Sequence, residues 1–139
     1  MTTMTEQIVE AISTRLRNAG LPVRDTDKSE PYSFESQVPC IVVDAGDEMR
    51  PPATGIGFYN WTLTVSLWIV AEGPTPKLAP EPLRAQAHVA VYSPDRTLGG
   101  LVSDISVTAV HRSTSEENPA LGLTEAIYEI MYRTPEGVM

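Results

Sequence analysis

The segment that most constrains the fold is residues 58–71, where apolar and polar side chains alternate along the chain. Trp61, Leu63, Val65, Leu67 and Ile69 alternate with Thr62, Thr64, Ser66 and Trp68. A period of two residues is typical of a β-strand that buries one face. A long strand of this kind needs partner strands beside it and an apolar layer over its buried face. The chain is therefore expected to contain a sheet that is covered on at least one side.

Three further segments supply the expected partner strands. Residues 39–44 (PCIVVD) form a β-branched run with a proline at its edge. Residues 104–112 alternate in the same way, with one face made of Ile105, Val107, Ala109 and His111. Residues 123–133 also alternate, with one face made of Ala126, Tyr128, Ile130 and Tyr132. Because loops of modest length join these strands, mainly antiparallel pairing is predicted.

Two segments show the spacing of amphipathic helices. Residues 3–19 begin with a capping box, in which Thr3 and Glu6 satisfy each other's backbone donors, and Gly20 suits the C-terminal turn. The second helix covers residues 82–92 and starts at Pro82. The sequence predicts a single domain over residues 1–139 of the α+β class: a two-layer sandwich of two helices on a four-stranded, mainly antiparallel sheet, in the order αββαββ. The predicted core consists of Ile8, Ile12, Leu16, Val42, Leu63, Val65, Leu83, Ala87, Val107 and Ile130.

The connecting segments differ in character. Gly99 and Gly100 are predicted to form a tight structural turn before the third strand, with at least one of them at positive φ. Residues 24–37, 45–57 and 113–122 are polar and rich in turn-forming residues, and we interpret them as long loops. Long loops in a small domain are commonly functional or disordered.

Composition disfavours several functions. Ten Lys and Arg stand against eighteen Asp and Glu, a net charge of −8, and the basic residues are scattered, so nucleic-acid binding is not expected as the main task. A single cysteine, Cys40, excludes an internal disulfide and any multi-cysteine metal site. The apolar-rich run of residues 58–71 is too short to span a bilayer, so no membrane association is expected.

No common catalytic pattern is present in the sequence. Gly55 and Gly57 begin a dinucleotide-like spacing, but a strand rather than a helix follows them. Cys40 could act as a nucleophile only with His88 or His111 as its base, and a small buried core residue is the simpler interpretation. We therefore expect no catalytic residues, no metal and no cofactor.

The order of elements resembles the tail terminator family of long-tailed bacteriophages, also called tail completion or minor tail protein U-like. The pieces that carry the resemblance are Thr97-Leu98-Gly99-Gly100 and Tyr132-Arg133-Thr134, set between the amphipathic first helix and the last strand. The resemblance covers residues 5–134. It implies a structural virion protein at the head–tail junction, assembled in the bacterial host cytoplasm and without enzymatic activity.

The partners follow from the same resemblance. It implies a homo-hexameric ring that caps the tail tube protein, ends tail polymerisation and presents a surface to a head-completion or connector protein, while DNA passes through the lumen without specific binding. Another head–tail connector or tail tube-like component is the alternative from the same class. A small ligand-binding domain or enzyme built from scattered residues is the alternative from a different class.

The candidate functional residues are accordingly surfaces. The last strand is apolar on both faces, and Trp68 falls on the polar side of the long strand, which favours a partner there. The predicted oligomer interface consists of Trp68, Ile127, Glu129, Met131 and Arg133. The predicted loops for docking to tube or connector contain Asp47, Glu48, Arg50, Glu116 and Glu117.

Overall fold

A computed structural model describes residues 3–24, 39–49, 58–114 and 120–135. The elements follow one another as two helices interleaved with strands, in the predicted order. They are α1 (Met4–Asn18), β1 (Val23–Arg24), β2 (Cys40–Met49), β3 (Phe58–Glu72), the 3-10 helix η2 (Pro76–Leu78), α2 (Glu81–Tyr92), β4 (Asp104–Thr114) and β5 (Leu121–Pro135).

The local signals at the first helix act as the sequence predicts. The Thr3 hydroxyl accepts a hydrogen bond from the Glu6 backbone N–H at 3.2 Å, and the Glu6 carboxylate accepts one from the Thr3 N–H at 3.0 Å. These two bonds satisfy donors that a helix start otherwise leaves open. At the other end Gly20 adopts φ 79°, a conformation that favours glycine, and the chain leaves the helix there.

The sheet has the strand order β1-β2-β3-β5-β4. β2, β3, β5 and β4 pair antiparallel, which confirms the α+β class and the four-stranded antiparallel sheet. The long strand β3 pairs with β5 along its whole length, from Phe58 opposite Pro135 to Glu72 opposite Leu121. The two-residue strand β1 was not expected. It adds to the sheet edge by parallel pairing with β2 at Ile41 and Val42.

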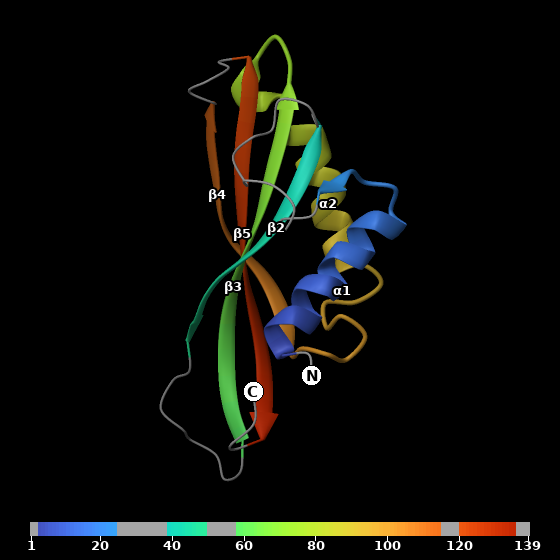
Figure 1. Cartoon of the computed structure of the whole chain (residues 1–139), viewed down its shortest axis with the longest axis vertical. Helices are drawn as coiled ribbons and strands as arrows, with labels where there is room; N and C mark the ends of the chain where they lie inside the picture. The colour runs from blue at the N-terminus through green and yellow to red at the C-terminus, as the bar shows by residue number, and fades with distance from the viewer. Residues whose placement is uncertain (1–2, 25–38, 50–57, 115–119, 136–139) are drawn as a thin grey trace.

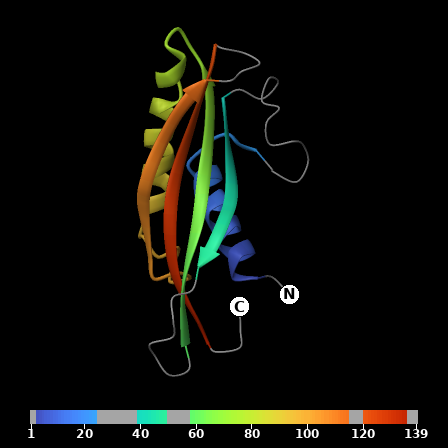
Figure 2. The ribbon, with the colours of Figure 1, turned by 90° about the vertical axis from the view of Figure 1, so that its left-hand side faces the viewer.

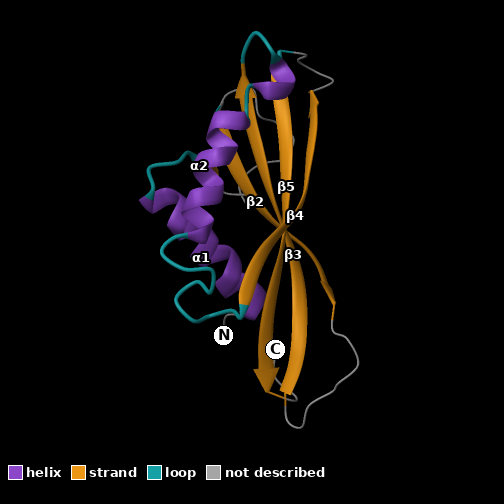
Figure 3. Cartoon of the chain, turned by 180° about the vertical axis from the view of Figure 1, so that it is seen from behind, coloured by secondary structure: helices purple, strands orange, loops and turns teal. Residues whose placement is uncertain are grey.

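Both helices lie on the same side of the sheet, α1 beside β2 and α2 farther along the same layer (Figure 1). The view from behind shows the same two layers (Figure 3). The main core fills the space between them and includes, from the predicted set, Ile8, Ile12, Leu16, Leu63, Val65, Ala87 and Ile130, with Leu83 partly buried against it. We call the side of the sheet that faces away from the helices the far face.

Two predicted core residues lie elsewhere. Val42 is buried on the far face, in a second apolar cluster with Cys40, Val70 and Leu121. Val107 is 39% exposed, because it lies on the edge strand β4. Val107 was assigned from alternation and Val42 from a β-branched run, and neither pattern identifies which faces and edges of the sheet the fold covers.

Bulges change two further expectations. β2 continues to Met49 through a one-residue bulge between Ala45 and Glu48, so the start of the expected 45–57 loop is strand. In β4 one extra residue between Val107 and Ala109 reverses the alternation. As a result His111 pairs with Glu125 on the far face rather than sharing a face with Ile105 and Val107.

β3 and β5 are longer than their neighbours. β2 ends at Met49 opposite Thr62, and β4 begins at Asp104 opposite Met131. Beyond these pairs the two central strands continue as a two-stranded ribbon, which extends past the helical layer at the lower end of Figure 1.

Candidate functional site

The five predicted interface residues all lie on the far face, spread along the two central strands. Trp68 lies on β3, and the other four lie at every second position along β5. Glu129 and Arg133 are exposed, Met131 is 42% exposed, and Trp68 and Ile127 are half-buried. All five therefore belong to the two central strands of the sheet. Their role as an oligomer interface stays a prediction.

Trp68 already has neighbours within its own chain. Its side chain packs, together with Leu123, against the far-face cluster of Cys40, Val42, Val70 and Leu121. Cys40 is thus a buried residue of this cluster, 3% exposed. Apolar packing inside the subunit therefore covers part of the Trp68 side chain.

Arg133 has an intrachain contact at the ribbon formed by β3 and β5. Its Nε donates to Asn60 Oδ1 at 3.2 Å, and the two residues are register partners across the strands. Trp61 fastens the same ribbon from the helix side, because its Nε1 donates to Thr134 Oγ1 at 2.8 Å and its ring stacks on Tyr132. The resemblance motif Tyr132-Arg133-Thr134 therefore holds the ends of β3 and β5 together.

Of the predicted docking residues, Arg50, Glu116 and Glu117 lie outside the described residues. Asp47 and Glu48 lie in strand β2 and not in a loop. Glu48 Oε1 accepts hydrogen bonds from Tyr132 Oη at 2.6 Å and from the Thr5 hydroxyl. Burial and the neighbouring Glu48 carboxylate raise the pKa of Tyr132 far above its usual value. Glu48 thus ties α1 to the sheet.

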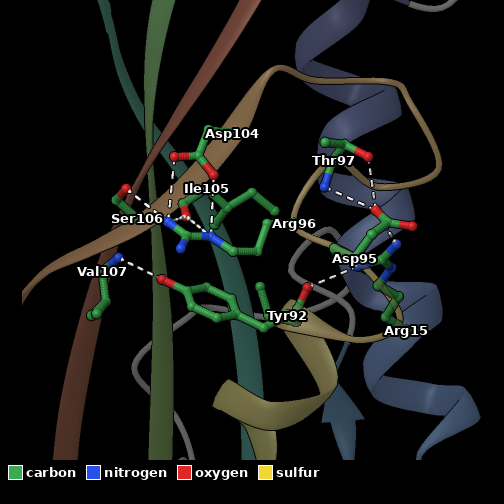
Figure 4. A network of polar contacts seen from close by, with 10 residues as sticks. Arg15, Tyr92, Asp95, Arg96, Thr97, Asp104, Ile105, Ser106 and Val107 are labelled. Carbon is green, nitrogen blue, oxygen red and sulfur yellow. Dashed lines mark hydrogen bonds and ion pairs between the residues drawn. The ribbon is translucent and has the colours of Figure 1, made fainter.

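The segment that links α2 to β4 is organised around Asp95 (Figure 4). Asp95 Oδ1 accepts from the Thr97 N–H at 2.9 Å, the Thr97 hydroxyl at 2.8 Å and the Gly99 N–H at 3.2 Å. These bonds, and then that from Arg15, favour the carboxylate and hold the pKa of Asp95 well below its usual range. Gly99 and Gly100 both have positive φ, 71° and 94°, which confirms the predicted turn.

Arg15 joins this turn to the first helix. Its Nη1 donates to the Val91 carbonyl at 2.9 Å and the Asp95 carbonyl at 2.5 Å, while Nη2 contacts Asp95 Oδ1 at 3.2 Å. One guanidinium therefore connects α1, the end of α2 and the following turn. A planar group with several fixed donors suits this task.

The next residue, Arg96, lies against the outer edge of β4. Its Nη2 and Nε donate to the Ile105 carbonyl at 2.7 and 3.1 Å, and its Nε is 3.1 Å from Asp104 Oδ1. Its guanidinium also stands 4.8 Å from the centre of the Tyr92 ring, whose hydroxyl accepts from the Val107 N–H at 3.1 Å. Figure 4 shows both side chains reaching the strand from the same side. Together they satisfy two outward backbone groups of β4.

His88 takes part in an aromatic cluster. Its Nδ1 is 2.9 Å from Tyr128 Oη, and its ring contacts that of Tyr92 at 4.3 Å between centres. Burial lowers the pKa of His88 and raises the pKa of Tyr128 to about 12. Within the part of the chain that the structure describes, no three His, Cys, Asp or Glu residues converge in a way that could hold a metal ion. No described helix has the length and apolarity needed to cross a membrane.

Sequence reasoning missed the roles of Arg15, Asp95 and Arg96. The available signal was local: an aspartate two residues before a threonine and four before a glycine is typical of a side chain that accepts backbone N–H groups in a turn. The contacts of Arg15 and Arg96 had no signal of this kind, because they join residues that the fold brings together from distant elements.

Comparison with known proteins extends the structural observations. No known family model matches the chain, and no curated protein matches it in sequence. Among solved structures, a chain of one described as "Virion of native gene transfer agent (GTA) particle" is similar, with a TM-score of 0.50. The match covers 91% of this chain and 94% of that chain at 10% identity. The likeness therefore concerns the fold, over nearly the whole of both chains.

Proposed function

We propose that this protein is a structural subunit of a phage-like virion, and that it acts as a tail terminator. Such a subunit forms a six-fold ring, binds the end of the tail tube, stops its growth and offers a surface for head attachment. The observation that carries the proposal is the shared fold with a virion chain over 91% of the sequence. The resemblance of Thr97–Gly100 and Tyr132–Thr134 to the terminator family supports the finer assignment.

The polar clusters of the described residues are consistent with a structural role. Asp95 shapes a turn, Arg15 joins two helices through the Val91 carbonyl, and Glu48 ties α1 to the sheet through the Thr5 hydroxyl. Each group is engaged in holding elements together. A subunit that must keep its shape while it contacts several neighbours benefits from such rigid fastenings.

The charge of the far face supports the same assignment. Asp44, Glu125 and Glu129 project from this face together with His111 and the cation Arg133, and the chain as a whole carries a net charge of −8. Carboxylates repel the phosphates of DNA, so a surface of this kind lets a duplex pass without adhering to it. The far face of the sheet is accordingly the side that we assign to the lumen of the ring.

The test is an assay of tube length. Tail tube protein is polymerised with and without the purified chain, and tube lengths are measured by electron microscopy. A terminator added during growth shortens the tubes and acts at a molar ratio far below one per tube subunit. A tube component, the alternative, copolymerises and is found along the tube wall. Unchanged tube lengths with no protein at the tube ends contradict the terminator assignment.

A further inference from the structure

The two edges of the sheet differ in how much of their backbone is already paired. At one edge, among the described residues, β1 pairs with β2 only at Ile41 and Val42, which leaves Val43 to Met49 of β2 without a described outer partner strand. At the other edge β4 has no partner strand beyond β5 among the described residues. Figure 2 shows β4 and β2 at opposite margins of the sheet, with both helices behind it. An edge strand carries outward N–H and C=O groups that can pair with another strand.

The first half of the β4 edge is closed by the chain itself. The Ile105 carbonyl is held by Arg96, and the Val107 N–H is bonded to the Tyr92 hydroxyl. After the bulge, residues 109–114 have no comparable side-chain bonds to their outward backbone among the described residues. The alternation of an antiparallel ladder, shifted by the bulge, turns the backbone groups of Val110 outward. The open part of this edge is therefore its second half.

We propose that residues 109–114 of β4 pair antiparallel with residues 43–49 of β2 in a neighbouring copy of this chain. The strand directions permit it. Four successive antiparallel strands leave β2 and β4 running in opposite directions, so a copy related by rotation continues the antiparallel ladder. The interface uses two different surfaces of each subunit, as a cyclic ring requires. This pairing rests on the proposed ring and names the surfaces that build it.

The positions of the open segments suit a closed ring. Strand β3 serves as a ruler for the heights of the two segments along the sheet. Through their register partners, Ala109 and Thr114 of β4 are at the heights of Ser66 and Ala71 of β3. Met49 of β2 is at the height of Thr62. Pairing the two segments therefore shifts each copy along the strand direction by about four residues, or about 13 Å, relative to its neighbour. Each copy contributes four strands, which are about 19 Å wide across the sheet. This offset tilts the strands by about 35°, the lower end of the tilt found in closed barrels.

The side chains of the two segments are complementary in charge. β2 carries the exposed carboxylates of Asp44 and Asp47, and β4 carries the exposed guanidinium of Arg112 next to the exposed side chain of His111. Asp44 and His111 share the far face, so the proposed pairing brings them to the same side of the joint. Arg112 Nη2 lies 3.1 Å from Glu81 Oε2 in the same subunit. This ion pair fixes the guanidinium at the edge of β4 that would face the neighbouring copy. Opposite charges on facing edges also fix which edge meets which.

The first test replaces the outward N–H of Val110. Val110→Pro removes this donor, and proline is tolerated on an edge strand whose N–H faces outward. Val110→Ala is the matched control, because it trims the side chain and keeps the N–H. Mass by sedimentation is measured against protein concentration. We expect Val110→Pro to raise the concentration of half-assembly at least tenfold, with Val110→Ala close to the parent and the melting temperature of the unassembled variants similar.

The second test is a charge swap, which does not depend on a proline. His111→Glu and Asp44→Lys each weaken assembly, and the double variant recovers it, since the two charges then attract across the joint. Rings that form in every variant as in the parent overturn the pairing while leaving the ring intact. A parent chain that stays monomeric at all concentrations, alone and with tail tubes, overturns the ring and the pairing together.

Discussion

Gly122 lies where the 3-10 helix η2 crosses the end of β5, and it offers a sharp test of the packing. A Cβ built on Gly122 would stand 1.7 Å from the Pro76 carbonyl oxygen, 2.7 Å from the Pro76 carbonyl carbon and 2.9 Å from Pro80 Cδ. All three atoms belong to backbone or to a proline ring, so no flexible side chain can move aside. Gly122→Ala therefore has to push η2 away from the strand.

The magnitude follows from this geometry. Real Cβ atoms essentially never come within 3.0 Å of such neighbours, so η2 has to retreat by more than 1 Å. Overpacking of this kind costs about 1–3 kcal/mol or more, whereas the stiffer unfolded chain returns about 0.4–1 kcal/mol. We expect a net loss of about 2 kcal/mol in the free energy of unfolding, which corresponds to a melting temperature lower by about 8 °C.

The assay is thermal and urea unfolding followed by circular dichroism. Gly46→Ala is the matched control, because it makes the same change in strand β2, where the nearest atom is the Thr64 carbonyl oxygen at 3.2 Å. A shift of a few tenths of an ångström relieves that contact, and we expect a change within about 1 kcal/mol. If Gly122→Ala melts within about 2 °C of the parent, η2 does not rest on β5 and the reasoning is wrong.

Three further predictions concern single side chains. The pKa of Asp95 is lower in the folded than in the unfolded chain, so its carboxylate stabilises the fold above the unfolded pKa of about 3.9, and this contribution is lost as the pH falls. Asp95→Asn should therefore lower the melting temperature at pH 7. It should also reduce the drop in melting temperature between about pH 5 and pH 3. The pKa of Tyr132 is higher in the folded than in the unfolded chain, so stability should fall as the pH rises above about 10. Tyr132→Phe should remove part of that fall. At pH 7 it should lower the free energy of unfolding by about 1–2 kcal/mol, since Glu48 loses a hydrogen-bond donor. Arg133 lies on the far face of a central strand, away from the two paired edges. Arg133→Glu should therefore leave assembly, measured by sedimentation, close to that of the parent, and the melting temperature of the subunit within about 2 °C, since its contact with Asn60 is exposed.

The helices and the central strands could be predicted because their signals are local. The Thr3–Glu6 capping box, the spacing of Ile8, Ile12 and Leu16, and the alternation from Trp61 to Ile69 each depend on a few neighbouring residues. Gly99 and Gly100 were identifiable for the same reason, because a positive φ favours glycine at that position. Periodicity and turn chemistry thus account for the fold class.

The features that sequence could not supply depend on partners distant in the chain. The bulge in β4 is set by its pairing with β5, and it moves His111 to the far face. β1 is a strand only through its pairing with Ile41 and Val42 of β2, which are distant from it in the chain. The packing of Trp68 against Val42 and Val70 forms only when β2 and β3 are in register. The alternation of apolar and polar residues shows which side chains share a face of a strand. Whether such a face is exposed depends on the elements that the fold packs against it.

The central claim is that this chain forms a ring at the end of a tail tube, and imaging tube ends tests it most directly. Purified protein is incubated with tail tubes, and the tube ends are averaged by electron cryomicroscopy. The account predicts a six-fold ring at one end of each tube, with a protein mass of about 91 kDa for six subunits of 15.2 kDa, and with the helices on the outside of the ring. Bare tube ends, or protein spread along the tube wall, would contradict it.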